Sequence, residues 1–286
     1  MAGSPLDALR DLPLADRAVA LSWLGQAGFA LRTGGTGGTG GAGGTTALID
    51  PFLSPWDGRL YESALPAARA EGVDLVLVTH EHIDHFDAAS APAIAAASPE
   101  AVFVVPAPIV GMVAESGIAP DRVVGVQPGD DIELAGLRIR PVPAMHGVTM
   151  ADAYGFGREL SGGLVRFLGF VLDAGGVRVY HAGDTIHFDG MEVTLRDLEI
   201  DVGLLPINGR DPEREARGIV GNLSEREAAW LAREVAFDLL IPMHYDLFAR
   251  NRGYPSRVVD SVDRDHPGVP VFVPAREHPF ELGARR

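Results

Sequence analysis

Residues 76–85 constrain the fold of this chain most strongly, because an apolar strand there runs directly into a dense set of imidazoles and carboxylates. The segment is Val-Leu-Val-Thr-His-Glu-His-Ile-Asp-His. His80 and His82, two residues apart, lie on the same side of an extended backbone, whereas Asp84 and His85 follow as the chain turns toward a helix. Such a cluster is rare as packing and typical of metal ligands. The pattern predicts a metal-binding loop in which each pair holds one cation.

Apolar runs of strand type alternate along the chain with segments of helical composition, which is typical of a layered α/β fold. The chain has 286 residues, 47% of them apolar, which is ample for a buried core. A capping-box pattern, Ser224 followed by Glu227, marks one helix start and excludes Ser224 as a nucleophile. We predict helices at 87–97, 108–116 and 224–236 and strands at 19–23, 28–32, 46–49, 76–78, 101–105, 123–126, 137–143, 167–173, 177–180, 202–205 and 239–241.

Two glycine-containing segments interrupt this alternation. Residues 34–44 are almost all Gly and Thr, but no Gly-Lys-Ser/Thr follows, so we predict a flexible loop insertion and not a phosphate-binding loop. Residues 155–163 are predicted to form a second loop, and one role that we consider for it is that of a lid over the active site. Because no linker and no long repeat divides the sequence, we predict a single domain over residues 1–286.

Composition excludes several classes of partner and chemistry. The chain has no cysteine, which rules out disulfides and thiolate ligands, so any metal must be held by nitrogen and oxygen. A formal charge of −15 without a Lys/Arg-rich run argues against a nucleic-acid partner. No apolar run approaches the roughly 20 residues of a membrane span, and no leader is visible, so we expect a cytoplasmic location. The sequence leaves a homo-oligomer open.

Each remaining candidate ligand directly follows a predicted strand: His146, Asp184 and His244, like His80 before them. If the carboxyl ends of these strands share one rim, the side chains converge. We then expect one ion at His80, His82 and His146 and a second at Asp84, His85 and His244, with Asp184 bridging both. Two divalent ions acidify a shared water and stabilise the oxyanion that forms when it attacks a carbonyl or phosphoryl centre, so we predict a hydrolase.

Two residues outside this set bear on it. Asp50 ends its strand next to Pro51, where a carboxylate either caps a turn or orients a metal-bound imidazole. Gln26 lies in the turn 25–28 between two strands, and we expect it not to touch a ligand. The three tryptophans, Trp23, Trp56 and Trp230, are interpreted as packing residues.

The ligand pattern resembles that of the metallo-β-lactamase-fold hydrolases, through Thr79-His80-Glu81-His82-Ile83-Asp84-His85, His146, Gly183-Asp184-Thr185 and His244. This resemblance spans most of the chain. It implies an α/β fold built as a four-layer αββα sandwich, with a dinuclear site at the sheet edge and the same ligands.

Within these hydrolases, the C-terminal half is similar to the L-ascorbate-6-phosphate lactonase group. The similarity rests on residues 180–185, 206–211, 217–218 and 241–246. It implies zinc or manganese as cofactor, and ligation by nitrogen and oxygen alone does not choose between the two. Gln26 departs from the pattern, since related hydrolases often have His at that position.

Five further residues are candidates for catalysis or substrate binding. Each has two possible interpretations. Asn208 either donates a hydrogen bond to an oxyanion or closes a turn, and His187 either assists proton transfer or lies in solvent. Arg210 pairs with a substrate phosphate or carboxylate, or forms a surface salt bridge to Asp211 or Glu213, and the same choice holds for Arg217. Tyr245 reaches the substrate or packs in the core. Arg217 rests on the resemblance alone.

We therefore expect a metal-dependent hydrolase whose metal-bound hydroxide attacks a small anionic ester or lactone. A phosphodiesterase of the phospholipase-D-like or RNA-processing type is the alternative enzyme. A metal-binding protein without turnover is the alternative outside enzymes, since fold and function are separable.

Overall fold

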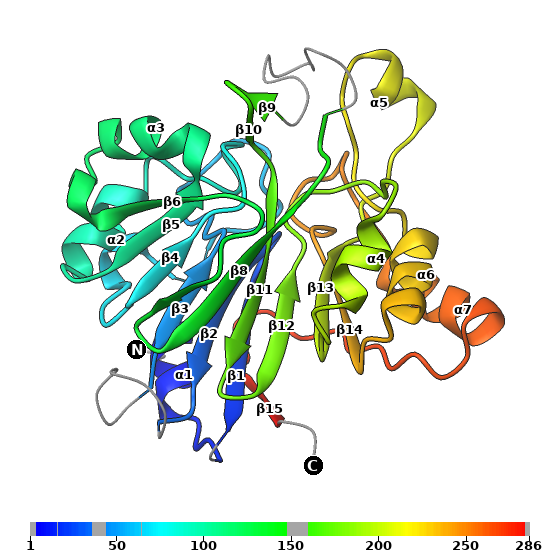
Figure 1. Cartoon of the computed structure of the whole chain (residues 1–286), viewed down its shortest axis with the longest axis horizontal. Coiled ribbons are helices and arrows are strands. Elements are labelled where there is room, and N and C mark those ends of the chain that lie inside the picture. Colours follow the sequence, from blue (N-terminus) through cyan, green and yellow to red (C-terminus); the bar gives the residue numbers. More distant parts are fainter. Residues whose placement is uncertain (1–3, 16, 36–43, 64, 148–159, 284–286) are drawn as a thin grey trace.

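Two mixed β-sheets face each other, with helices against the outer side of each (Figure 1). The computed structural model describes residues 4–15, 17–35, 44–63, 65–147 and 160–283. Positions 36–43 of the predicted insertion and 155–159 of the predicted lid lie outside these ranges. The arrangement is the metallo-β-lactamase fold that the sequence predicts.

The first sheet has seven strands in the order β15-β1-β2-β3-β4-β5-β6. Its N-terminal strands pair antiparallel, and β3, β4, β5 and β6 run parallel. The bounds are β1 Ala18–Gly25, β2 Gly28–Thr33, β3 Thr46–Ile49, β4 Leu75–Leu77, β5 Val102–Pro106, β6 Val123–Val126 and β15 Phe280–Gly283.

The second sheet has six strands in the order β14-β13-β12-β11-β8-β7. Here β12, β13 and β14 are parallel, and β11 runs antiparallel to both β12 and β8. The bounds are β7 Ile132–Leu134, β8 Leu137–Pro143, β11 Leu168–Ala174, β12 Val177–His181, β13 Val202–Pro206 and β14 Leu239–Met243. A separate two-stranded ribbon pairs β9, Leu160–Ser161, with β10, Leu164–Val165.

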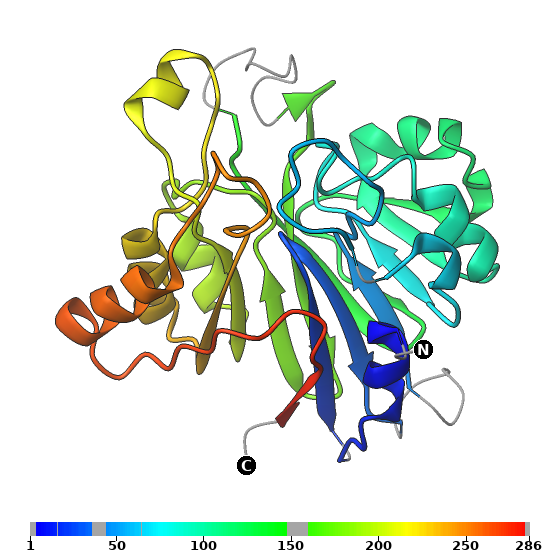
Figure 2. The ribbon, with the colours of Figure 1, turned by 180° about the vertical axis from the view of Figure 1, so that it is seen from behind.

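The helices complete the layers. Short helices α1 Pro5–Asp11, α2 Ala91–Ala97 and α3 Val110–Glu115 pack on the outer face of the first sheet, where Leu6, Leu48 and Phe103 belong to one apolar cluster. Helices α4 Met191–Arg196, α6 Glu225–Val235 and α7 Pro255–Asp265 cover the second sheet, and α5 Pro212–Ala216 projects from the rim (Figure 2). Alternate residues of each strand face the opposite layers, which produces the four-layer order.

Several local predictions are confirmed. Ser224 caps α6 as a capping box, with its hydroxyl accepting from Glu227 N at 3.2 Å and its own N donating to Glu227 Oε2 at 2.8 Å. Gly175 and Gly176 form the two-residue turn between β11 and β12 with φ values of 67° and 100°, a left-handed conformation that favours glycine.

None of the helices among the described residues has the length and apolar composition of a membrane span.

Other boundaries differ from prediction. The predicted helix 87–97 begins only at Ala91, because the Asp87 carboxylate accepts hydrogen bonds from Leu53 N and Ser54 N and holds its own segment in a turn. The predicted helix 108–116 splits into a 3-10 turn, Ala107–Ile109, and α3. The sequence did not predict α1, α4, α5, α7 or the short strands β7, β9, β10 and β15, most of which have too few residues to show a clear period.

Candidate metal centre

The strand directions bring the candidate ligands to one rim of the molecule. In the first sheet β3 and β4 are parallel, so Asp50 and His80 leave it at the same edge. In the second sheet β8, β12, β13 and β14 all point one way, because β11 is antiparallel to its two neighbours β8 and β12. His146, Asp184 and His244 therefore follow strand ends at a common edge. This is the convergence that the sequence predicts.

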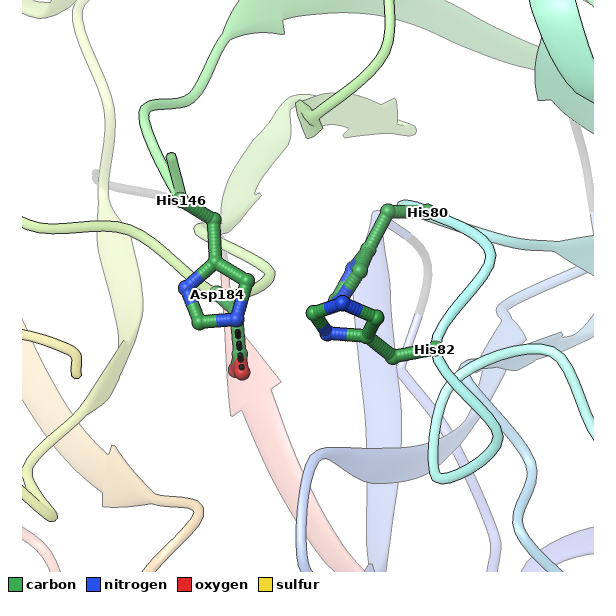
Figure 3. A group of neighbouring side chains, drawn as sticks. All are labelled: His80, His82, His146 and Asp184. Atoms are coloured by element: carbon green, nitrogen blue, oxygen red, sulfur yellow. Dashed lines mark ion pairs between the residues drawn. The ribbon is translucent and has the colours of Figure 1, made fainter. Parts of the chain in front are cut away.

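A first group of possible ligands consists of His80, His82, His146 and Asp184, all buried. One ligand atom from each lies within 4.8 Å of the others. Figure 3 shows His80 and His82 pointing from the loop after β4 toward His146 and Asp184, which come from the second sheet. His146 Nε2 lies 3.4 Å from Asp184 Oδ2. Three imidazoles and a carboxylate oxygen are a donor set typical of zinc and of other first-row divalent metals.

A second group consists of Asp84, His85 and His244. His244 Nε2 lies 3.3 Å from Asp84 Oδ2, and His85 Nε2 lies 4.0 Å from the same oxygen. The other oxygen of Asp184, Oδ1, is 3.3 Å from His85 Nε2 and 3.2 Å from His244 Nε2. Asp184 therefore presents one oxygen to each group, which is the geometry of a bridging carboxylate.

Asp50 and Thr79 fix the orientation of one histidine in each group. The fully buried Asp50 carboxylate accepts from His85 Nδ1 at 2.7 Å and from Thr79 Oγ1 at 2.7 Å. Because Thr79 Oγ1 gives its proton to Asp50, it accepts from His80 Nδ1, 3.1 Å away. Both Nδ1 atoms thus carry a proton, and both Nε2 atoms face the ligand groups. Of the two roles considered for Asp50, orienting an imidazole is the one these contacts favour.

The electrostatics of the two groups differ. Burial holds the pKa of His80 well below its usual value and, with His146 adding to it, lowers the pKa of His82 to about 3. Burial also disfavours the charged form of His85, but neighbouring carboxylates led by Asp184 outweigh it and raise the pKa of His85 well above its usual value. The histidines of the first group are thus neutral nitrogen donors, whereas His85 lies in the field of several carboxylates, which also attracts a metal cation.

Buried acceptor atoms without hydrogen-bond partners test whether these residues fit a metal. His80 Nε2, His85 Nε2 and Asp184 Oδ1 are buried and have no hydrogen-bond partner in the described structure. Burial keeps the pKa of His80 low, so its ring is neutral and the buried Nε2 lone pair has no donor to accept from. At His85, a cation can replace the proton that the neighbouring carboxylates hold on Nε2, 3.3 Å from Asp184 Oδ1, so the residues fit a divalent metal.

Gln26 lies against the second group, so the expectation that it touches no ligand is wrong. Its Nε2 donates to Asp84 Oδ2 at 2.8 Å and lies 3.1 Å from His244 Nε2. The backbone holds it in place, since His244 N donates to Gln26 O at 2.8 Å and Gln26 N donates to Asp246 Oδ1 at 3.2 Å. The prediction failed because β1 comes from the first sheet, and sequence alone does not place the end of β1 beside β14.

Removing the amide donor of Gln26 is expected to weaken ion binding at Asp84, His85 and His244. Gln26→Met keeps the side-chain length but leaves Asp84 without its donor, and the loss of such an outer partner costs roughly tenfold or more in metal affinity. Calorimetric titration of metal-free protein with Zn²⁺ measures it. Gln127→Met, which removes hydrogen bonds to Val126 and Val165 instead, is the control. Equal affinities in both variants would contradict this role.

A cavity of about 720 Å³ opens over both ligand groups. His82, Asp84, His146, Asp184 and His244 contribute to its lining. Most of the remaining lining residues are cationic, amide or apolar: Arg214, Arg217, Arg250, Asn208, Asn222, Asn251, Trp56, Ile83, Ile219, Val220 and Phe248. Gly221 and one carboxylate, Glu81, also line the cavity, and Glu81 is neutralised by a salt bridge to Arg166. The volume is within the usual range for a small-molecule site.

Two of the five secondary candidates line the cavity. Arg217 is exposed at its rim. Asn208 is buried, and its amide is held on both sides: Nδ2 donates to Asn251 Oδ1 at 2.8 Å, and Oδ1 accepts from Asn222 Nδ2 at 2.9 Å. The structure therefore places both residues where substrate contact is open to them.

The other three candidates do not line the cavity. Arg210 donates to Glu215 Oε1 at 2.5 Å. This is a surface salt bridge, as in the alternative considered for Arg210, but its partner is Glu215 and not Asp211 or Glu213. His187 contacts Glu192 Oε2 at 3.2 Å and packs edge-on against Trp230. Tyr245 is buried, with its ring stacked on Trp23 at 5.1 Å between centroids. Each of these side chains is thus engaged by the protein itself, in a packing or surface role and not in contact with the cavity.

Sequence reasoning missed Arg214, Arg250 and Asn251, and it interpreted Trp56 wrongly as a packing residue. Trp56 is 46% exposed and lines the cavity. Arg250 and Asn251 follow His244 within the same loop, so the rule that strand ends share a rim was a usable signal for them. No comparable signal marked Arg214 or Trp56.

The comparison with known protein families agrees with this fold and site. Residues 45–245 match the model of the beta-lactamase superfamily domain. Solved structures of the same fold include Igni18, a metallo hydrolase from Ignicoccus hospitalis, with a TM-score of 0.67 and 23% identity over 94% of this chain and all of that one. An isothiocyanate hydrolase from Delia radicum gut bacteria has a TM-score of 0.71 and 17% identity over 93% of this chain and all of that one. The fold and the His/Asp groups thus define a metallo-β-lactamase superfamily hydrolase.

Comparison with sequence relatives identifies the family within this superfamily. A UPF0173 metal-dependent hydrolase of Methanoculleus marisnigri is 33% identical over 229 residues, which are 80% of this chain and 81% of that protein. Another, from Thermoplasma volcanium, is 30% identical over 92% of this chain and 99% of that one. The chain belongs to the UPF0173 metal-dependent hydrolase family.

Proposed function

We propose that this protein is a dinuclear hydrolase of small anionic esters or lactones, with zinc or manganese as its metal. The observation that carries the proposal is Asp184, whose Oδ2 faces His146 in the first group and whose Oδ1 faces His85 and His244 in the second. His80, His82 and His146 would hold one ion, and Asp84, His85 and His244 the other, with Asp184 shared.

The reaction follows from what these groups supply. Divalent ions bound there would acidify a water and act as Lewis acids toward a carbonyl or phosphoryl oxygen. The chain itself contributes orientation: Asp50 holds the His85 ring, and Gln26 holds the Asp84 carboxylate. Asp84, at the floor of the cavity, accepts a hydrogen bond from the attacking water and orients it.

The cations of the cavity support an anionic substrate. Within the described residues, Arg217 and Arg250 form no ion pair and lie exposed at the rim. Arg214 is held by Asp211 and donates to Asn251 Oδ1 at 2.8 Å, so it is committed to positioning the amides. Guanidinium groups bind carboxylates and phosphates in a bidentate fashion, so we assign the anion-binding role to Arg217, for which it was predicted, and to Arg250 in place of Arg210.

Elemental analysis of the purified protein, followed by a substrate panel with the metal found, tests the proposal. We expect close to two equivalents of metal and turnover of carboxylate- or phosphate-bearing esters or lactones, and the panel includes a sugar-acid phosphate lactone. Activity on bis-p-nitrophenyl phosphate far above that on lactones would favour a phosphodiesterase instead. Metal-replete protein that is inert toward the whole panel would overturn an enzymatic role.

Truncation of the rim arginines is expected to raise KM for anionic substrates and leave kcat nearly unchanged. Arg217→Ala or Arg250→Ala removes a charge-assisted hydrogen bond, which corresponds to roughly tenfold in KM. Steady-state kinetics with a charged lactone and its neutral methyl ester measure the effect. Arg210→Ala is the control, since its guanidinium is engaged by Glu215, and an equal rise in all variants would contradict the assignment.

A further inference from the structure

Five apolar side chains gather at the cavity beside the rim arginines. We define the apolar wall as Trp56, Ile83, Ile219, Val220 and Phe248. Trp56 is 46% and Ile83 41% exposed, although most large apolar residues of the described chain are buried. Apolar side chains that line a cavity beside a few polar groups usually mark where a ligand binds.

The apolar wall is built on a rigid support. Phe52 lies behind it, with ring centroids 6.5 Å from both Trp56 and Phe248. Arg59 covers Phe52 at 4.6 Å and donates to Ser54 O at 2.7 Å. These contacts hold the aromatic rings in fixed positions, so the surface that they present is preorganised.

A buried carboxylate anchors the loop that carries Trp56. Asp87 accepts from Leu53 N at 3.0 Å, from Ser54 N at 2.7 Å and from Ser54 Oγ at 2.8 Å. Asp87 is two residues beyond His85, so the anchor comes from the same segment as the candidate ligands. The segment that carries the candidate ligands thus also holds the Trp56 loop of the apolar wall in place, through Asp87.

The loop that carries Trp56 and the α5 region that precedes Arg217 meet two different parts of the segment after β14. The loop that carries Trp56 meets the segment after β14 through a hydrogen bond from Leu60 N to Leu247 O of 2.9 Å. On its other side this segment meets the α5 region, since Arg214 donates to Asn251. Figure 2 shows these three segments around the same rim. A molecule bound over the candidate ligands can therefore place its charge near Arg217 and its apolar part near Trp56.

From this arrangement we infer that the substrate is an amphiphile, with an anionic group and an apolar acyl or aryl group flanking the scissile bond. The inference rests on the proposed function and specifies its substrate class. A sugar lactone, polar on all sides, leaves the apolar wall without a partner. An acyl chain buries it and removes apolar area from water on both surfaces.

Binding of straight-chain carboxylates from acetate to octanoate to the metal-replete protein tests the inference. Calorimetric affinity is expected to rise by roughly two- to fourfold for each added methylene, as for burial of apolar area. Trp56→Ala and Phe248→Ala are expected to flatten this dependence. An affinity that does not depend on chain length, or a dependence unchanged in both variants, overturns the inference.

Tryptophan emission gives a second readout. Longer carboxylates are expected to shift the emission of the native protein to shorter wavelength, since Trp56 moves from water into contact with the chain. Trp56→Phe removes this shift but keeps the dependence on chain length, whereas Trp230→Phe keeps both. A shift that survives in Trp56→Phe places the chain elsewhere and overturns the inference. Because binding is measured without turnover, failure of the substrate panel affects the proposed function and not this result.

Discussion

Asp184→Asn is expected to lose at least one equivalent of metal and nearly all turnover. The substitution keeps the shape of the side chain but replaces one of two charged oxygens, each of which faces a different ligand group. Metal assistance is worth several kcal/mol of transition-state stabilisation, so kcat is expected to fall by about three orders of magnitude. Elemental analysis and steady-state kinetics on the same preparation measure both quantities.

Two further variants serve as comparison and control for Asp184→Asn. Asp84→Asn belongs to the second group only, so it is expected to reduce binding of one ion and spare the other. Asp173→Asn, near the opposite end of the second sheet and paired with Arg178 at 3.5 Å, controls for loss of a carboxylate. Unchanged metal content in Asp184→Asn would exclude Asp184 as a shared ligand, whatever happens to turnover.

Asp50→Asn is expected to lower the affinity of both metal positions by roughly ten- to a hundredfold, the usual effect of losing an outer-shell partner. The Asp50 carboxylate accepts from His85 Nδ1 directly and from His80 through Thr79. Thr79 Oγ1 and His85 Nδ1 share the oxygen Oδ2, and Oδ1 accepts from Thr79 N at 2.8 Å. An asparagine places an N–H donor against at least one of these donors, so it cannot keep all the contacts that orient the two imidazoles. Titration of the metal-free variant with Zn²⁺ and with Mn²⁺ measures the loss.

Asp74→Asn is the matched control for Asp50→Asn. Its carboxylate accepts from Thr46 N at 2.8 Å near the other end of the same pair of strands, away from the ligands. We expect metal binding of this variant to equal that of the native protein. If Asp50→Asn weakened only one of the two positions, the link from Asp50 through Thr79 to His80 would be wrong.

The metal centre was predictable because each ligand belongs to a short-range pattern. His80, His82, Asp84 and His85 share one loop, and His146, Asp184 and His244 each follow an apolar strand. A strand end is visible in a single sequence, and parallel strands bring their ends to one edge. The α6 cap and the turn at Gly175 are equally local, and both are confirmed.

The rest of the site depends on contacts between segments far apart in the chain. Gln26 meets Asp84 across 58 positions, and Arg214 meets Asn251 across 37. No local pattern predicts which strands become neighbours or how two sheets lie against each other. His187 shows the converse error: it is close to Asp184 in sequence, but its ring turns toward Glu192 and Trp230.

The anchor at Asp87 has a consequence for how substrate range evolves. Its three hydrogen bonds hold the main chain at Leu53 and Ser54, and position 56 lies just beyond that fixed point. If Trp56 contacts the substrate as we infer, substitutions there are expected to change which substrates are accepted and to leave metal binding unchanged. Directed evolution toward new specificities should begin there, with Asp87 left unchanged.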